Sequence, residues 1–146
     1  SGFAPLELVE SVAGLTDLFL YDVKLMDAKR HQDFTGASNQ TILQNLEWLT
    51  KHGPPVIIRF PLLPGINDDA ENIESLGKFV SALSSEPLID VLPYHRAGID
   101  KYTRLGHAYR LADEAPPTDD KIRTTVLTLR TFGLEVKVRG DSYDDE

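Results

Sequence analysis

The feature that most constrains the fold is a regular alternation of short apolar runs with longer amphipathic segments. Four apolar runs have the length of buried strands, at residues 18–24, 56–60, 88–94 and 134–138. Segments with apolar residues at helical spacing separate them, at residues 4–13, 38–51, 67–83 and 118–132, with a short helix or turn at 27–34. Strands that alternate with helices of this length form parallel βαβ units with right-handed crossovers. We therefore predict an α/β fold.

Local signals predict where these elements begin and end. Ser38 or Asn39 can cap the second long helix, and Asn67 or Asp68 the third. The proline- and glycine-containing run at 61–65 is predicted to end the second strand. Three or four βα units are too few to close an eight-stranded barrel. The chain is therefore either a small open sheet or one part of a larger barrel.

Composition excludes several classes of function. Fifteen basic and twenty-three acidic residues give a formal charge of −8, which argues against a nucleic-acid surface because phosphate binding needs a concentrated basic face. No apolar run reaches the length of a membrane span, and the first residues do not resemble a signal peptide. We expect a soluble, cytoplasmic protein in which residues 1–140 form the folded part and the acidic residues 141–146 a solvated tail.

The chain has no cysteine. This excludes disulfides, thiolate zinc sites and a cysteine-held iron–sulfur cluster within these residues. The histidines are too far apart in sequence to form a local metal motif, so a zinc enzyme is not expected. They are His31, His52, His95 and His107.

Polar side chains stand at the carboxyl end of each of the first three predicted strands. Asp22 and Lys24 share one face of the first strand because side chains alternate. Arg59 interrupts the second apolar run, and His95 follows the third. Ligands bind at the carboxyl ends of strands in α/β architectures. A carboxylate, two cations and an imidazole at this edge suit a small anionic or zwitterionic ligand that carries a ribose.

Each of these residues also has a structural interpretation. Asp22 and Lys24 can pair with each other across the strand end. Arg59 can be a buried, paired residue or extend its charge to solvent. His95 can bond to loop backbone. The joint placement of these residues on three consecutive strands is what favours the functional interpretation.

Four short runs occur in the order and at the spacing of one known family. They are Asp22–Asp27 (DVKLMD), His31–Asn39 (H-x-x-x-T-G-x-S-N), Arg59–Asp68 (R-x-P-L-L-P-G-I-N-D) and Leu92–His95 (LPYH). With these runs the chain, from about residue 6 to residue 138, resembles the carboxyl-terminal half of glycyl-radical-enzyme activating enzymes, a group that includes pyruvate formate-lyase activating enzyme. The resemblance implies half of a partial, six-stranded (β/α)6 barrel similar to a TIM barrel.

The resemblance also implies a radical S-adenosylmethionine oxidoreductase. In that family a 4Fe-4S cluster, reduced by flavodoxin or ferredoxin, cleaves S-adenosylmethionine to methionine and a 5′-deoxyadenosyl radical. The radical removes a hydrogen atom from a glycine of a partner such as pyruvate formate-lyase, glycerol dehydratase or a decarboxylase. Carried over by motif, the residues implied to contact S-adenosylmethionine are Asp22, Val23, Lys24, Arg59 and His95. Some members hold a monovalent cation near the equivalent of Asp22.

The chain departs from the family in one respect. The family holds its cluster with a Cys-x-x-x-Cys-x-x-Cys motif near the amino terminus, and no cysteine is present here. We therefore expect a fragment that lacks the cluster-binding half and is inactive alone. The missing half would leave one sheet edge and apolar surface uncovered, so we expect the isolated piece to form a dimer or larger oligomer.

Two alternatives stay open. A lysine beside a carboxylate at a strand end suits an imine-forming nucleophile, so Lys24 can also belong to a Schiff-base aldolase. The loop at residues 95–117 is basic within an acidic chain and can dock an acidic partner, as in a non-catalytic α/β binding module. Its basic residues include Arg96, Lys101, Arg104 and Arg110.

Overall fold

The computed structural model describes residues 2–94 and 115–138, and the fold is given for these. The strands are β1 (Phe19–Asp22), β2 (Val56–Leu62), β3 (Leu88–Pro93) and β4 (Val136–Val138). They form one parallel sheet in the order β1-β2-β3-β4. The helices are α1 (Leu6–Ala13), α2 (Ala28–Thr35), α3 (Gln40–His52), α4 (Ala70–Ser81) and α6 (Asp119–Arg130). The predicted α/β fold of consecutive parallel βα units is confirmed.

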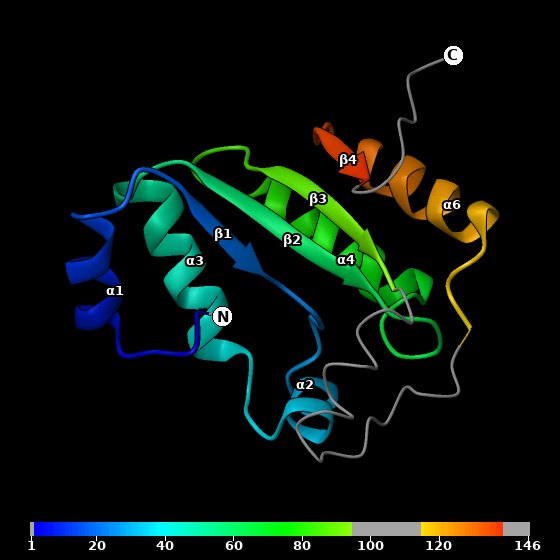
Figure 1. Cartoon of the computed structure of the whole chain (residues 1–146), viewed down its shortest axis with the longest axis horizontal. Helices are drawn as coiled ribbons and strands as arrows, with labels where there is room; N and C mark the ends of the chain where they lie inside the picture. The colour runs from blue at the N-terminus through cyan, green and yellow to red at the C-terminus, as the bar shows by residue number, and fades with distance from the viewer. Residues whose placement is uncertain (1, 95–114, 139–146) are drawn as a thin grey trace, which may run out of the picture.

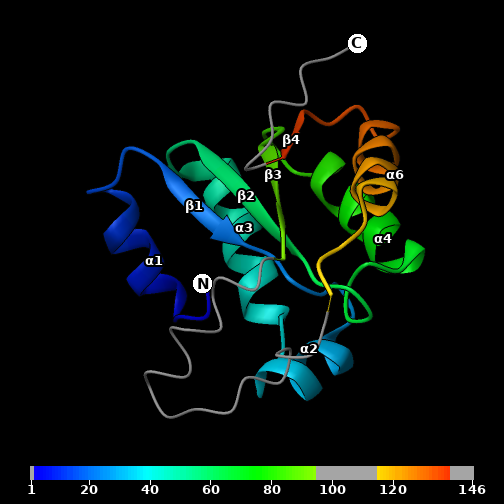
Figure 2. The ribbon, with the colours of Figure 1, turned by 45° about the vertical axis from the view of Figure 1, so that its right-hand side comes forward.

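Helices cover one face of the sheet. Figures 1 and 2 show α3 and α4 lying along the same side, with α6 beside α4 and α1 beside α3. Strand β2 alternates between buried and partly exposed residues along its whole length, as a strand with one covered face must. The core lies between this face and the helices. Its fully buried members include Ile58, Phe60, Ile89, Leu46, Leu49, Leu76 and Leu129.

The opposite face carries no helix among the described residues. Leu20, Ile57 and Leu88 lie side by side across it, from β1 to β3. Two residues further along each strand, a row of alternating charges crosses all four strands. It consists of Asp22, Arg59, Asp90 and Lys137. Opposite charges on neighbouring strands stabilise a sheet, so this row combines strand pairing with a polar surface on the open face.

The prediction that Pro61 ends the second strand is wrong, because β2 continues to Leu62. The backbone carbonyl of Arg59 accepts from the N–H of Val23, so the polar backbone groups of residues 59 and 61 point toward β1. Strand β1 ends at Asp22. The N–H that Pro61 lacks therefore has no strand to pair with, and the proline is tolerated.

The predicted caps of α4 are also wrong. Asp69 is the N-cap, and its side chain accepts from the N–H of Asn72. Asn67 and Asp68 precede the helix and bond elsewhere. At α3, Asn39 occupies the predicted N-cap position, but its side chain makes no capping bond. The side chains of Asn39 and Asn67 are turned inward instead, where they hold other backbone.

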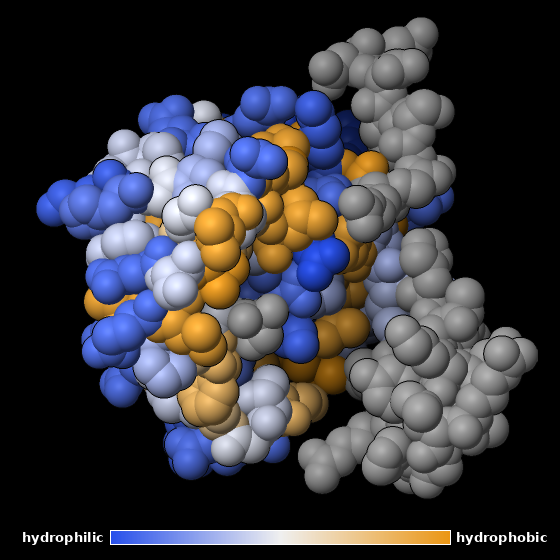
Figure 3. All heavy atoms as spheres, turned by 60° about the vertical axis from the view of Figure 1, so that its left-hand side comes forward, coloured by the Kyte–Doolittle hydropathy of each residue, from blue (hydrophilic) through white to orange (hydrophobic). Residues whose placement is uncertain are grey.

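Exposed apolar side chains concentrate near the amino-terminal end of the chain. Most of the large apolar residues that are exposed in the described structure belong to residues 3–20, and Leu15 is the most exposed, at 90%. Figure 3, which brings the side of α1 and β1 forward, shows apolar side chains running across this face. Strand β1 pairs only with β2 among the described strands, so its other edge is open.

No helix of the described residues is both long and apolar enough to cross a membrane.

This open edge and its apolar surroundings lead to a testable expectation. We expect the 146-residue chain to self-associate, with a sedimentation coefficient that rises with concentration, because exposed strand edges and apolar patches are covered by association. Leu20→Lys, in the middle of β1 and on the open face, should shift the chain toward monomer. Leu127→Lys, at a similarly exposed site on α6, is the matched control. A wild-type chain that sediments as a monomer at every concentration would contradict the expectation.

Candidate functional site

The polypeptide leaves the sheet after Asp22 and runs in extended form to α2. Val23 and Leu25 are each 2% exposed, whereas Lys24 between them is exposed. The alternation of the strand therefore continues past its last sheet residue. It places Asp22 and Lys24 on one face of the chain, as the sequence predicted, and the structure turns this face away from the core.

Asp22 is paired with Arg59. The Nε and Nη2 atoms of Arg59 lie 2.7 and 2.6 Å from the same carboxylate oxygen, Oδ1. No ion pair joins Asp22 to Lys24 in the described structure, so the pairing that could have explained both residues structurally is not formed. Arg59 orients the carboxylate, and the second oxygen, Oδ2, has no hydrogen-bond partner among the described residues.

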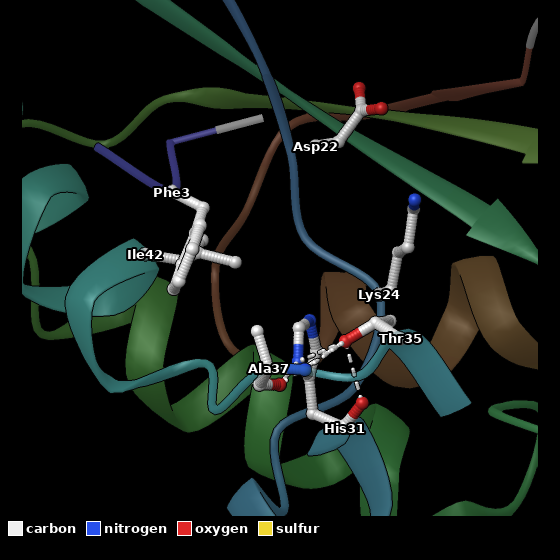
Figure 4. Close-up of a pocket in the computed structure, with 7 residues that line it drawn as sticks. All are labelled: Phe3, Asp22, Lys24, His31, Thr35, Ala37 and Ile42. Carbon is white, nitrogen blue, oxygen red and sulfur yellow. Dashed lines mark hydrogen bonds between the residues drawn. The ribbon is translucent and has the colours of Figure 1, made fainter. Parts of the chain in front are cut away.

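A cavity of about 180 Å³ opens beside the end of β1. Figure 4 shows the residues that line the cavity, with the side chain of Lys24 extending in the direction of Asp22. Apolar side chains form one wall, and Asp22 and Lys24 provide opposite charges across from it. The lining consists of Phe3, Asp22, Lys24, His31, Thr35, Ala37 and Ile42.

The apolar wall of the cavity is held by two buried hydrogen-bonding groups. The side-chain amide of Asn45 donates to the carbonyls of Gly2 and Ala4 at 2.8 and 2.9 Å, which fixes the backbone on both sides of Phe3. The Tyr21 hydroxyl donates to the carbonyl of Ile42 at 2.6 Å. Burial raises the pKa of Tyr21 well above its ordinary value, so this donor keeps its proton.

Three buried asparagines hold the backbone that follows β1. The amide of Asn39 donates to the carbonyls of Leu25 and Met26 at 2.9 and 2.8 Å. The side chain of Asn72 accepts from the N–H of Met26 at 2.9 Å. The amide of Asn67 donates to the carbonyl of Lys24 at 2.9 Å. All three side chains are 3% exposed or less, and we call them the asparagine clamp.

Asn67 also ties the clamp to the end of β2. Its amide donates to the carbonyl of Pro61 at 2.7 Å, and its oxygen accepts from the N–H of Leu63 at 2.8 Å. Its own backbone carbonyl accepts from the amide of Asn72. The side chain of Asn67 thus bonds the segments at the carboxyl ends of two neighbouring strands to each other, and its backbone carbonyl connects them to the start of α4.

The residues after Asn67 fix the loop on which it stands. Gly65 has a φ of +72°, which favours glycine, and its N–H donates to Asp68. Arg30 of α2 donates to the carbonyl of Ile66 and to the carboxylate of Asp69, at 2.6 and 2.7 Å. The hydrogen bond from Arg30 holds the pKa of Asp69 below its usual range. The loop between β2 and α4 is therefore anchored at both of its ends.

The remaining predicted site residues lie as follows. The side chain of Val23 faces the core and its N–H is bonded to Arg59, so only its carbonyl is left for a ligand. Arg59 does not line the cavity and acts on it through Asp22. His95 lies outside the described residues. Within the described ranges, no group of three or more histidines or acidic residues is placed to hold a metal ion.

Sequence comparisons connect this geometry to known proteins. The chain is 36% identical over 140 residues to the choline trimethylamine-lyase activating enzyme of Oleidesulfovibrio alaskensis, a match that covers 94% of the chain and 45% of the relative. It is 38% identical over 130 residues to the pyruvate formate-lyase-activating enzyme of Streptococcus mutans, covering 89% of the chain and 49% of the relative. The chain is a relative of the glycyl-radical-enzyme activating enzymes.

A solved structure of an activating-enzyme domain has the same fold as this chain. The crystal structure of a domain of pyruvate-formate lyase-activating enzyme from Bacteroides vulgatus superposes with a TM-score of 0.77 and 29% identity, covering 94% of this chain and 76% of that one. No family model matches the chain. The chain spans about half the length of the curated activating enzymes that it matches.

Sequence reasoning missed most of what holds the site. It considered Asn39 and Asn67 only as helix caps, gave Asn72 no role, and named His31 among the histidines that form no local metal motif. Asn39 and Asn67 belong to two of the runs that carry the family resemblance, and that was the available signal. Asn72 stands within an amphipathic helix, where nothing in the pattern marks it.

We expect Asn67→Ala to lower the free energy of unfolding by roughly 3 kcal/mol, because it removes three hydrogen bonds and leaves two part-buried carbonyls and one N–H without these partners. Urea denaturation measures this change. Gln44→Ala, an exposed amide on α3, is the control and should stay within about 0.5 kcal/mol of the wild type. Equal effects of the two substitutions would show that the clamp contributes nothing to stability.

Proposed function

We propose that this chain is the S-adenosylmethionine-binding, carboxyl-terminal portion of a glycyl-radical-enzyme activating enzyme. The observation that carries the proposal is the cavity at the carboxyl end of β1, where Asp22 and Lys24 present opposite charges. It lies at the edge of the sheet where α/β proteins bind ligands, in a chain related to activating enzymes. The activity itself, an oxidoreductase reaction, belongs to the longer protein.

The chemistry of the lining suits the polar parts of S-adenosylmethionine. The ammonium of Lys24 can bind the ligand's carboxylate, and its exposed position leaves it available. The Oδ2 atom of Asp22 can accept from a ribose hydroxyl or an ammonium group, while Arg59 keeps the carboxylate in place. His95 is assigned to the same ligand by family resemblance. A monovalent cation at Asp22 would use the same free oxygen and would need further ligands from elsewhere.

A 4Fe-4S cluster does not fit the residues present, because none of the 146 is a cysteine. We therefore assign the cluster, and its reduction by flavodoxin or ferredoxin, to sequence outside this chain. S-adenosylmethionine, when bound in such an enzyme, supplies the 5′-deoxyadenosyl radical that takes a hydrogen atom from a glycine. The residues described here bind and orient that ligand. We expect the chain alone to activate no glycyl radical enzyme, pyruvate formate-lyase included.

The two alternative functions gain no support. Lys24 is exposed beside a carboxylate, whereas an imine-forming lysine is activated by desolvation or by a neighbouring cation. The binding-module hypothesis depends on the loop at residues 95–117, of which residues 95–114 lie outside the described structure.

An NMR titration of the 146-residue chain with S-adenosylmethionine tests the proposal, because NMR detects weak binding by half a site. We expect the amide resonances of Asp22 to Leu25 to shift. Asp22→Asn and Lys24→Ala should each weaken binding about tenfold or more, as expected for a lost hydrogen bond to a charged group.

Lys29→Ala is the matched control, since it removes an exposed ammonium from α2 outside the cavity. It should leave the dissociation constant unchanged. The proposal would be contradicted if no amide resonance shifted on addition of S-adenosylmethionine. It would also be contradicted if all three variants weakened binding equally.

A further inference from the structure

His31 is a buried histidine that the proposed function does not use. It lies in α2, is 4% exposed, and lines the cavity together with Asp22 and Lys24. A buried polar side chain normally has all its bonding groups satisfied. Each of its two ring nitrogens is therefore expected to have a hydrogen-bond partner.

The first nitrogen, Nδ1, is fixed as a donor. It lies 2.7 Å from the carbonyl oxygen of Ala37 and 3.0 Å from the hydroxyl of Thr35. A carbonyl can only accept, so Nδ1 carries a proton. The Thr35 hydroxyl has two carbonyls to donate to, those of His31 and Ala37, at 2.7 and 3.1 Å. The Thr35 hydroxyl therefore has acceptors for its proton other than Nδ1 of His31.

The second nitrogen, Nε2, has no hydrogen-bond partner among the described residues. In the neutral ring it is an acceptor, because Nδ1 holds the only proton. No buried side-chain nitrogen or oxygen of the described structure is sealed without a partner, so Nε2 keeps some access to solvent, and His31 is one of the residues that line the cavity. Figure 4 shows the ring standing between Thr35 and Ala37, at the base of the space below Asp22 and Lys24.

We propose that Nε2 of His31 is a ligand-binding atom of this cavity, which accepts a hydrogen bond from an O–H or N–H group of the bound ligand. The inference rests on the proposed function, under which the ligand is S-adenosylmethionine. That molecule offers three kinds of donor, the amino group of its adenine, the hydroxyls of its ribose and the ammonium of its amino-acid end. The cavity is about 180 Å³, smaller than pockets that enclose a whole ligand, which start at about 300 Å³. It therefore accommodates one end of the molecule.

A structural role for His31 accounts for only half of these observations. The bond from Nδ1 to Ala37 fastens the end of α2 to the segment that leads into α3, and any donor at that position would do the same. It gives no reason for a second nitrogen, directed at a cavity that also holds a carboxylate and an ammonium.

Two substitutions distinguish the role of Nδ1 from that of Nε2. In His31→Asn the side-chain amide nitrogen can take the place of Nδ1 and donate to Ala37, but nothing replaces Nε2. In His31→Gln the longer side chain carries its amide to the position of Nε2 and gives up the bond to Ala37. Each variant and the wild type are measured for S-adenosylmethionine affinity by NMR titration and for unfolding free energy in urea.

We expect His31→Asn to keep wild-type stability and to bind S-adenosylmethionine roughly tenfold more weakly, the ratio that corresponds to one hydrogen bond. His31→Gln should retain more affinity than His31→Asn while being the less stable of the two. In the wild type, the ¹⁵N resonance of Nε2 should move when ligand is added, while that of Nδ1 stays. Titration with methionine and with 5′-methylthioadenosine then shows which end of the ligand moves it.

Three outcomes overturn the inference. If S-adenosylmethionine shifts the amides of Asp22 and Lys24 but neither moves the Nε2 resonance nor binds His31→Asn less well, His31 is structural and the proposed function still stands. If His31→Asn loses affinity and stability together while His31→Gln matches it in both, the loss is one of folding. If no resonance of the chain responds to the ligand, the inference and the proposed function fail together.

Discussion

Past the N–H of Val23, which still bonds to Arg59 of β2, the backbone that leaves β1 needs hydrogen-bond partners that no strand provides. Strand β1 stops at Asp22, yet residues 23–26 remain largely within the protein, where an unpaired carbonyl or N–H is costly. The asparagine clamp supplies the missing partners. An amide side chain suits this role because it donates and accepts at once without carrying a charge into the interior. The position of Lys24, and with it the polar side of the cavity, depends on these bonds.

The clamp also explains why three of the four motif runs belong together. The run after β1 contains the backbone that is held, the run in α2 and its following turn provides Asn39, and the run after β2 provides Asn67. Arg30 and Asp69 join α2 to α4 across the same region. Segments that are separate in sequence are thus hydrogen-bonded to one another at one edge of the sheet. The residues that carry the family resemblance mostly build the frame, and few of them touch the cavity.

Sequence reasoning succeeded where a single periodic signal decides the structure. Apolar runs predicted the strands, and the alternation of side chains along a strand predicted that Asp22 and Lys24 share one face. It failed where the outcome depends on a neighbour in space. Pro61 is typical of a strand end, but β2 tolerates it because β1 has already ended beside it. Asn67 is typical of a helix cap, but its amide bonds instead to the backbone at the ends of two neighbouring strands. The partner of Arg59 could not be predicted either, because Asp22 is opposite it only through the register of β1 and β2.

Native-state hydrogen exchange tests most directly whether the asparagine side chains hold this backbone. The N–H groups of Met26 and Leu63 lie outside helices and strands, and each donates to a clamp side chain. We predict that both exchange as slowly as the amides in the middle of β2, because they open only when the frame opens. Exchange of these two amides at the rate of exposed loop amides, while β2 stays protected, would contradict the account.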